Sequence, residues 1–229
     1  MQNPHLYFFG CSFTYLETSD TGHIFDNFTN IISKKSICSS LNYAISGNSN
    51  EQIINKIYNL NERDYGANDI FIIQFTFNDR LGMYFDLENK FVSMCKREYA
   101  DSPIDNIKIN FYNDWLKYFY SRQTRIKEFK KQVDFVCTWL KSKNIKFICF
   151  GMDEDMDSEY FTDLFYQRNN FIKFDNTYSL YGHMCLNKLR ISDMPEYQKE
   201  NIAWDFHLNN EGHNYLANKI LEKILIWVV

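Results

Sequence analysis

The chemistry-bearing residue that comes first in the chain is a serine placed just after an apolar run. The stretch Phe8-Phe9-Gly10-Cys11-Ser12-Phe13-Thr14 ends that run at a glycine and presents a hydroxyl two residues later. This pattern predicts a serine at the carboxyl edge of a parallel sheet, where open α/β sheets bind their ligands. Ser12 is therefore a candidate nucleophile, and the alternative is a serine that caps the amino terminus of a helix.

Nucleophilic catalysis by a serine needs more than the hydroxyl. A base must take its proton, a carboxylate must hold that base, and hydrogen-bond donors must stabilise the oxyanion. Three later stretches carry residues of these types: Ser46-Gly47-Asn48-Ser49-Asn50, Phe77-Asn78-Asp79-Arg80, and Asp205-Phe206-His207 with Gly212-His213 downstream. Each follows a predicted strand or precedes the last predicted helix, so all four stretches can converge at one edge of a sheet.

The elements that must position these residues follow from hydrophobic periodicity. Strands are predicted at residues 6–10, at a segment ending near Ala44-Ile45, at 69–76, at 146–151 and, more weakly, at 170–175. Helices are predicted at 24–33, after an N-cap at Ser49 or Asn50, at 123–143 and at 211–226. Residues 81–122 have no clean period, and we expect an aromatic-rich insertion over the carboxyl edge of the sheet.

Strands that alternate with helices predict an α/β protein with a parallel sheet covered on both faces. A length of 229 residues with 45% hydrophobic content suits one well-buried domain, and no repeat or second boundary is visible. We therefore expect a single domain spanning residues 1–229.

Taken in order, the four stretches resemble the SGNH (GDSL-like) hydrolases. The matching segments are Gly10-Cys11-Ser12-Phe13-Thr14 (nucleophile block), Asn42-Tyr43-Ala44-Ile45-Ser46-Gly47-Asn48-Ser49 (glycine block), Phe77-Asn78-Asp79 (asparagine block) and Asp205-Phe206-His207 with Gly212-His213 (last block). The resemblance implies a flavodoxin-like three-layer α/β/α sandwich with a central five-stranded parallel sheet. It also implies hydrolysis of carboxylic esters, often acetyl groups on carbohydrates, with no metal or organic cofactor.

Carried over position by position, the resemblance implies a Ser-His-Asp triad. Ser12 would be the nucleophile, His207 the base and Asp205 the acid that orients it. The oxyanion hole would combine the backbone N–H groups of Ser12 and Gly47 with the side-chain amide of Asn78. Substrate contacts are expected from Asn48 and Arg80, and the alternative for Arg80 is a solvated side chain.

Each of these residues also has a structural alternative. Gly47 could be present only because the turn after the second strand needs a positive φ angle. Asn78 and Asp79 could cap a connection, Asp205 could cap the last helix, and His207 could be a loop histidine. The reserve candidates for the orienting carboxylate are Asp153, Asp155 and Asp175.

The sequence departs from the family pattern at three positions. Cys11 stands where an aspartate is usual, and Thr76 stands where a glycine commonly precedes the asparagine by two residues. Only one residue separates Asp205 from His207, where two are common, so His213 remains an alternative base.

Two other functions remain open on the same fold. An acyltransferase would use the same triad and pass the acyl group to a sugar hydroxyl instead of water. A non-catalytic carbohydrate-binding or assembly module would bind through aromatic residues of the insertion, such as Tyr84, Phe85, Tyr112, Trp115 and Tyr118.

Composition limits the partners and the location. A net charge of −4 argues against a nucleic-acid binder. The six cysteines lack the paired spacing of a zinc site and are typical of reduced, intracellular thiols. No signal peptide or membrane-spanning run is visible, so we expect a cytoplasmic protein that acts on a small-molecule or glycan ester.

Overall fold

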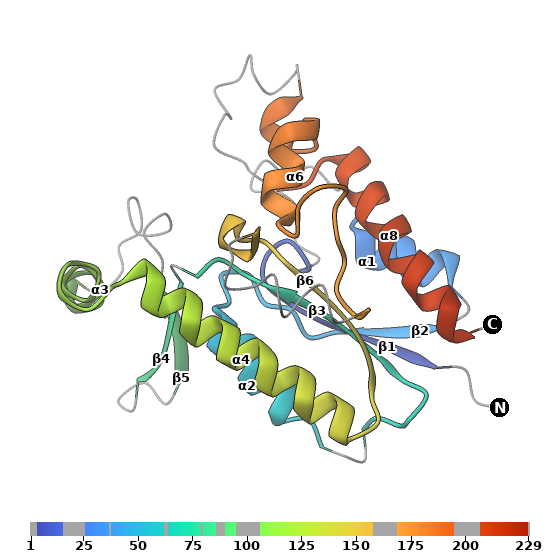
Figure 1. Ribbon diagram of the computed structural model, residues 1–229, viewed down its shortest axis with the longest axis horizontal. Coiled ribbons are helices and arrows are strands. Elements are labelled where there is room, and N and C mark those ends of the chain that lie inside the picture. The colour runs from blue at the N-terminus through green and yellow to red at the C-terminus, as the bar shows by residue number, and fades with distance from the viewer. Residues whose placement is uncertain are drawn as a thin grey trace.

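The computed structural model describes residues 4–15, 26–36, 38–61, 64–78, 80–85, 90–94, 106–157, 169–194 and 207–228. Its centre is a parallel sheet with the strand order β2-β1-β3-β6 (Figure 1). The strands are β1 (His5–Phe9), β2 (Ser39–Asn42), β3 (Ile70–Phe75) and β6 (Lys146–Gly151). This arrangement confirms the predicted α/β class and the parallel sheet.

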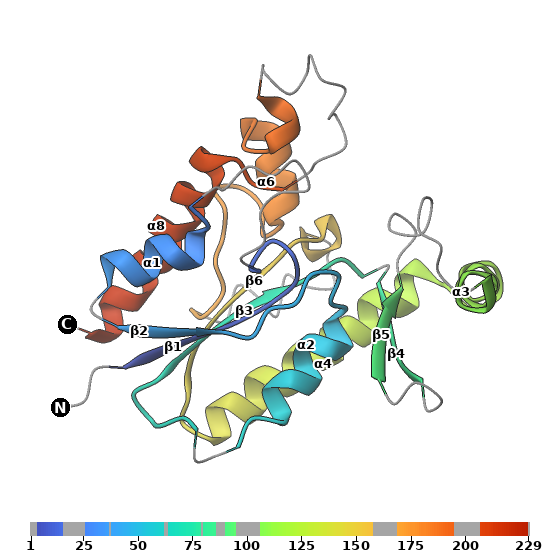
Figure 2. The same cartoon turned by 180° about the vertical axis from the view of Figure 1, so that it is seen from behind.

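Helices cover both faces of the sheet (Figures 1 and 2). On one face lie α1 (Phe28–Lys35) and α8 (Asn210–Val228), with α6 (Leu180–Asn187) near the carboxyl end of β6. The other face is covered by α2 (Asn50–Tyr58) and α4 (Arg122–Ser142). Short 3-10 turns occur at Glu154–Asp157 and Ile191–Asp193.

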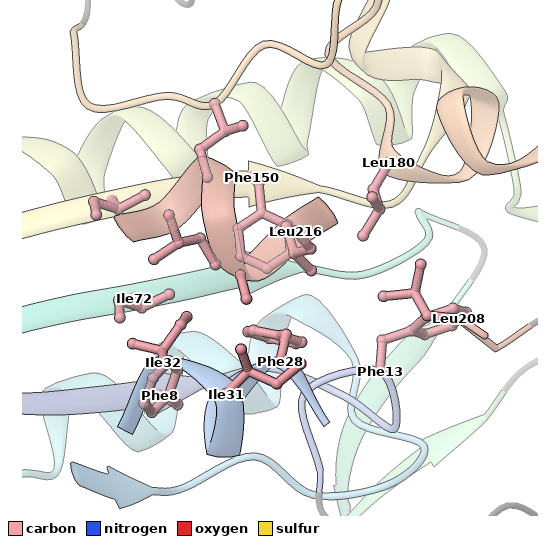
Figure 3. Close-up of a cluster of buried hydrophobic side chains, with 14 of the residues drawn as sticks. Phe8, Phe13, Phe28, Ile31, Ile32, Ile72, Phe150, Leu180, Leu208 and Leu216 are labelled. Carbon is pink, nitrogen blue, oxygen red and sulfur yellow. The ribbon is translucent and has the colours of Figure 1, made fainter. Parts of the chain in front are cut away.

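Each face has its own hydrophobic core because side chains of a strand point alternately to opposite faces. Ile70 and Ile72 of β3 belong to the core under α1 and α8, whereas Phe71 and Ile73 belong to the core under α2 and α4. Figure 3 shows the first of these cores, with Phe13 and Leu208 at the same end of the cluster. All six residues of β3 are buried, as the apolar run predicts for a central parallel strand.

The predicted fifth strand is not a strand of this sheet. Phe171 makes only an isolated parallel bridge to Cys149 of β6, and the next parallel bridge joins Gly151 to Ser179. Between them the backbone turns tightly, because Asp175 has a φ of 50° and Phe174 pairs antiparallel with Thr177. The turn inserts extra residues between the two bridges to β6, so the pairing there is not a continuous ladder.

The predicted insertion contains regular structure. β4 (Leu81–Phe85) and β5 (Lys90–Met94) form an antiparallel hairpin, and α3 (Asn106–Tyr118) follows. Both lie beyond the end of the sheet next to the amino-terminal end of α4 (Figures 1 and 2). The second strand also ends earlier than predicted, at Asn42, and α6 has no counterpart among the predicted helices.

Candidate active site

The turn that carries Ser12 follows directly on β1. The backbone N–H groups of Thr14 and Tyr15 both donate to the Cys11 carbonyl, at 3.0 Å each, which folds residues 11–15 into a compact turn. Ser12 is partly buried at this turn, whereas Cys11 and Thr14 are fully buried. The turn lies at the carboxyl edge of the sheet, as its position after β1 predicts.

Gln74, which sequence analysis did not single out, supports the turn from β3. Its side-chain carbonyl accepts hydrogen bonds from the Cys11 backbone N–H (3.3 Å) and the Thr14 hydroxyl (2.5 Å). This contact depends on Gly10, because a Cβ there would lie 2.6 Å from Gln74 Oε1 and 2.5 Å from Thr14 Oγ1. A polar residue near the end of an otherwise apolar strand was the only sequence signal for Gln74.

The glycine block forms the next turn at the same edge. Gly47 has a φ of 77°, a backbone conformation that residues other than glycine rarely adopt, so its turn needs a glycine. Asn48 is buried, and its side-chain amide donates to the Gly10 carbonyl at 3.1 Å. That hydrogen bond joins the glycine block directly to the nucleophile block.

The asparagine block is held by side chains from two other elements. Asn50, the first residue of α2, accepts from the Thr76 N–H (2.8 Å) and donates to the Thr76 carbonyl (3.2 Å). The Asn78 backbone N–H donates to Asp153 Oδ2 at 2.7 Å. The Asn78 side chain is only 2% exposed, yet neither its oxygen nor its nitrogen finds a hydrogen-bond partner among the described residues.

Arg80 lies beneath this block instead of in solvent, so the solvated alternative is wrong. Its side chain is buried, with the guanidinium 5.9 Å from the centre of the Phe77 ring. Nη1 donates to the Asn48 carbonyl at 3.2 Å. Arg80 and Asn48 therefore connect the asparagine, glycine and nucleophile blocks, and their contact with a substrate stays a prediction.

His207 meets the nucleophile block from the carboxyl-terminal part of the chain. Its ring centre lies 4.7 Å from that of Phe13, the residue after Ser12. The His207 carbonyl accepts from the Ile191 N–H at 2.9 Å, which fixes the backbone at this point. Asp205 and Asp79 lie outside the described residues, so their roles stay predictions.

His213 is a structural histidine. Its Nδ1 accepts a hydrogen bond from the Phe28 N–H at the start of α1, at 3.3 Å, and its ring stacks on Phe28. Burial, together with the charge of nearby His207, lowers the pKa of His213 from 6.5 to about 3. A histidine that is buried and this weakly basic is poorly suited to serve as a general base at neutral pH.

The start of α8 shows why Gly212 precedes His213. Asn209 Oδ1 accepts from the Gly212 N–H at 2.9 Å and so caps this helix. A Cβ on Gly212 would lie 2.7 Å from the Leu189 carbonyl oxygen. The close approach of these two backbone segments therefore requires a glycine at this position.

The reserve carboxylates are engaged in other contacts. Asp153 accepts from the backbone N–H groups of Asn78 and Asp155, and Asp155 pairs with Arg122. Asp175 accepts from the Tyr215 hydroxyl at 3.3 Å and lies 3.6 Å from His183 Nδ1. The role of Asp205 in orienting His207 stays a prediction.

The aromatic residues proposed for a binding module differ in exposure. Tyr112 is buried and stacks on Trp115, so it is not a surface binding residue, whereas Tyr118 is 65% exposed. The Tyr84 and Phe85 side chains lie outside what the structure describes. Within the described ranges, no group of three or more His, Cys, Asp or Glu side chains could hold a metal ion. No helix in those ranges has the length and hydropathy to cross a membrane.

Solved structures share this architecture over nearly the whole chain. A catalytic mutant of Axe2, an acetylxylan esterase from Geobacillus stearothermophilus, is similar with a TM-score of 0.55 and 15% identity over 96% of this chain and 94% of that protein. A putative lipolytic protein of the G-D-S-L family from Desulfitobacterium hafniense DCB-2 is similar with a TM-score of 0.52 and 10% identity, over 96% and 99% of the two chains. This chain has the fold of the SGNH (GDSL-like) hydrolases.

A third SGNH-fold protein, a G-D-S-L family member from Veillonella parvula DSM 2008, has a TM-score of 0.50 and 15% identity over 95% of this chain and 96% of its own. No protein-family model matches the sequence. No curated protein matches it either. The similarity that these structures show therefore lies in the fold.

Proposed function

We propose that this protein is a serine esterase that hydrolyses carboxylic esters, with acetyl groups on a carbohydrate as the substrate class. The contact between the rings of His207 and Phe13 carries the proposal, because it places an imidazole beside the turn of Ser12. The esterase activity named for Axe2 and the G-D-S-L name of the other similar structures agree with this assignment.

In the first half of the reaction, Ser12 Oγ attacks the acyl carbon while His207 takes the hydroxyl proton. The negative charge that develops on the carbonyl oxygen is stabilised by the N–H groups of Ser12 and Gly47 and by the Asn78 amide. His207 then gives its proton to the leaving alcohol, which leaves an acyl group on Ser12.

In the second half, His207 takes a proton from water as the water attacks the acyl group. The carboxylic acid leaves, and Ser12 recovers its proton from His207. Asp205 holds the imidazole in the required tautomer and stabilises its charged form. None of these steps requires a metal or an organic cofactor.

The test is labelling with a fluorophosphonate probe, read by intact mass and peptide mapping. We expect one adduct on Ser12 in the wild type, and its loss in Ser12→Ala and His207→Ala. His213→Gln, which keeps a hydrogen-bond acceptor, should still be labelled. Circular dichroism of each variant serves as the control for folding.

Other outcomes would favour the alternatives. An unlabelled but folded wild type would contradict the esterase and favour the non-catalytic module. If Ser12 is labelled but the acyl group passes to an added sugar faster than to water, the protein is an acyltransferase with the same triad. Screening of acetylated oligosaccharides then identifies the alcohol.

A further inference from the structure

The segment that carries Asn78 is irregular, so its backbone polar groups need partners from outside it. Asn50 and Asp153 hold Thr76 and the Asn78 N–H, as described above. The backbone carbonyls of Asn78 and Arg80 are both held by Arg125 of α4. Arg125 Nε donates to the Asn78 carbonyl and Nη2 donates to the Arg80 carbonyl, each at 3.3 Å.

Arg125 is itself held in place. Nη2 also donates to Glu51 Oε1 of α2 at 3.0 Å, and the two side chains are only 14% and 20% exposed. The guanidinium lies 5.6 Å from the centre of the Trp115 ring of α3. The contact with the ring and the burial reduce the screening of this ion pair by water and restrict where the guanidinium can lie.

The contacts of Arg125 continue to the turn of the proposed nucleophile. Arg80, whose carbonyl Arg125 holds, donates to the Asn48 carbonyl, and Asn48 donates to the Gly10 carbonyl. A continuous series of hydrogen bonds therefore joins α4 to each of the three blocks that would form the oxyanion hole.

We propose that Arg125, supported by Glu51, is a positioning residue that sets the orientation of the Asn78 amide. The expected effect of Arg125 on catalysis rests on the proposed function, whereas its positioning of the Asn78 segment does not. A planar guanidinium suits the task because it can donate to two carbonyls and a carboxylate at once, whereas a lysine ammonium cannot reproduce that fixed geometry.

The first experiment follows the hydrolysis of an activated acetyl ester. Arg125→Lys and Arg125→Ala should lower kcat by tenfold to about a hundredfold, with little change in KM, because a small misplacement of an oxyanion donor is this costly. Glu51→Gln should lower kcat in the same way but less. The matched control is Glu128→Gln, which removes the charge of the half-exposed second carboxylate near Arg125, at 3.4 Å, and should leave kcat unchanged.

A double-mutant cycle separates positioning from a general loss of structure. If Arg125 acts through Asn78, adding Arg125→Ala to Asn78→Ala should lower kcat by less than about twofold further. If the two losses multiply instead, Arg125 does not act through that amide and the inference is wrong.

Hydrogen exchange read by mass spectrometry tests the same inference without any catalysis. Arg125→Lys should speed exchange of the peptide spanning residues 75–81 by on the order of tenfold, with peptides from β1 and β6 unchanged. Unchanged exchange at 75–81 would overturn the proposal whether or not the wild type is an esterase. An inactive wild type with faster exchange in the variant would instead contradict the proposed function and leave the positioning role in place.

Discussion

Just beyond β3, the side-chain amide of Asn78 is buried, and its polar atoms have no partner among the described residues. A buried amide without hydrogen bonds destabilises a folded protein by about 1–3 kcal/mol. Such a cost is typical of active sites, where a donor is kept ready for charge that develops only in the transition state. The proposed oxyanion role of Asn78 would use this amide in catalysis, whereas a cap would use it within the fold.

This assignment predicts opposite effects on catalysis and stability. Asn78→Ala should lower kcat for an activated ester by about a hundredfold, because the loss of one oxyanion donor costs on the order of 3 kcal/mol of barrier. The same change should leave the midpoint of thermal unfolding equal or higher, because it removes an unpaired buried amide. Asn214→Ala, at an exposed residue on α8, is the control. Full activity in Asn78→Ala would rule out this oxyanion role.

At Gly10, close contacts with buried side chains leave no room for a Cβ atom. We expect Gly10→Ala to lower the free energy of unfolding by about 1–3 kcal/mol, because its Cβ would overlap the buried Thr14 and Gln74 side chains. The control is Gly66→Ala, since a Cβ at Gly66 has Asp69 Oδ2 as its nearest neighbour, at 3.9 Å. Urea denaturation of both variants measures the difference, and equal stability would contradict the close packing.

Among the elements, α2 links local sequence to the candidate site. Its first turn carries a capping box in which Ser49 accepts from the Gln52 N–H and the Gln52 side chain accepts from the Ser49 N–H. The next residue, Asn50, holds the backbone of Thr76 on both sides. The start of this helix therefore sets the position of the asparagine block.

Loss of the cap should be measurable both in stability and at the site. We expect Ser49→Ala to destabilise the protein by about 0.5–2 kcal/mol, the usual cost of removing an N-cap. It should also lower ester turnover, because Asn50 moves with the first turn of α2. Ser142→Ala is a suitable control, since the Ser142 hydroxyl is exposed and donates only within its own helix, to the Trp139 carbonyl. A Ser49→Ala variant as stable as the wild type would argue against the capping box.

Across the whole molecule, His213 links α8 to α1 on one face of the sheet. In the folded protein its pKa is about 3, whereas an exposed histidine in the unfolded chain titrates near 6.5. Between these two values the unfolded chain binds more protons than the folded protein. His213 therefore lowers the free energy of unfolding as the pH decreases from about 6.5 towards 3.

His213→Gln should make this pH dependence flatter, because glutamine does not titrate in this range. Burial also lowers the pKa of His183, so part of the slope should remain. Thermal unfolding of the wild type and the variant between pH 4 and 7 measures the two slopes. Identical slopes would mean that His213 is not neutral and buried as the structure has it.

Features that depend on neighbouring residues were predictable from the sequence. The apolar run of β3 and a cap at Ser49 or Asn50 were both predicted in this way, because strand burial and capping leave short, regular patterns, and the structure has the cap at Ser49. The four blocks were recognised because each follows a predicted strand or precedes a predicted helix, and their catalytic roles stay predictions. The fifth strand was wrong, because the turn at Asp175 depends on local geometry that a strand pattern does not reveal.

Only the tertiary structure distinguished residues of the same type that have different contacts. His207 and His213 lie close in sequence, but only the structure places one ring against Phe13 and the other beneath α1. Gln74 and Arg125 are separated from the residues they hold by 45 or more positions. No sequence periodicity connects such distant positions. Their contacts form only when the sheet and the helix α4 pack together.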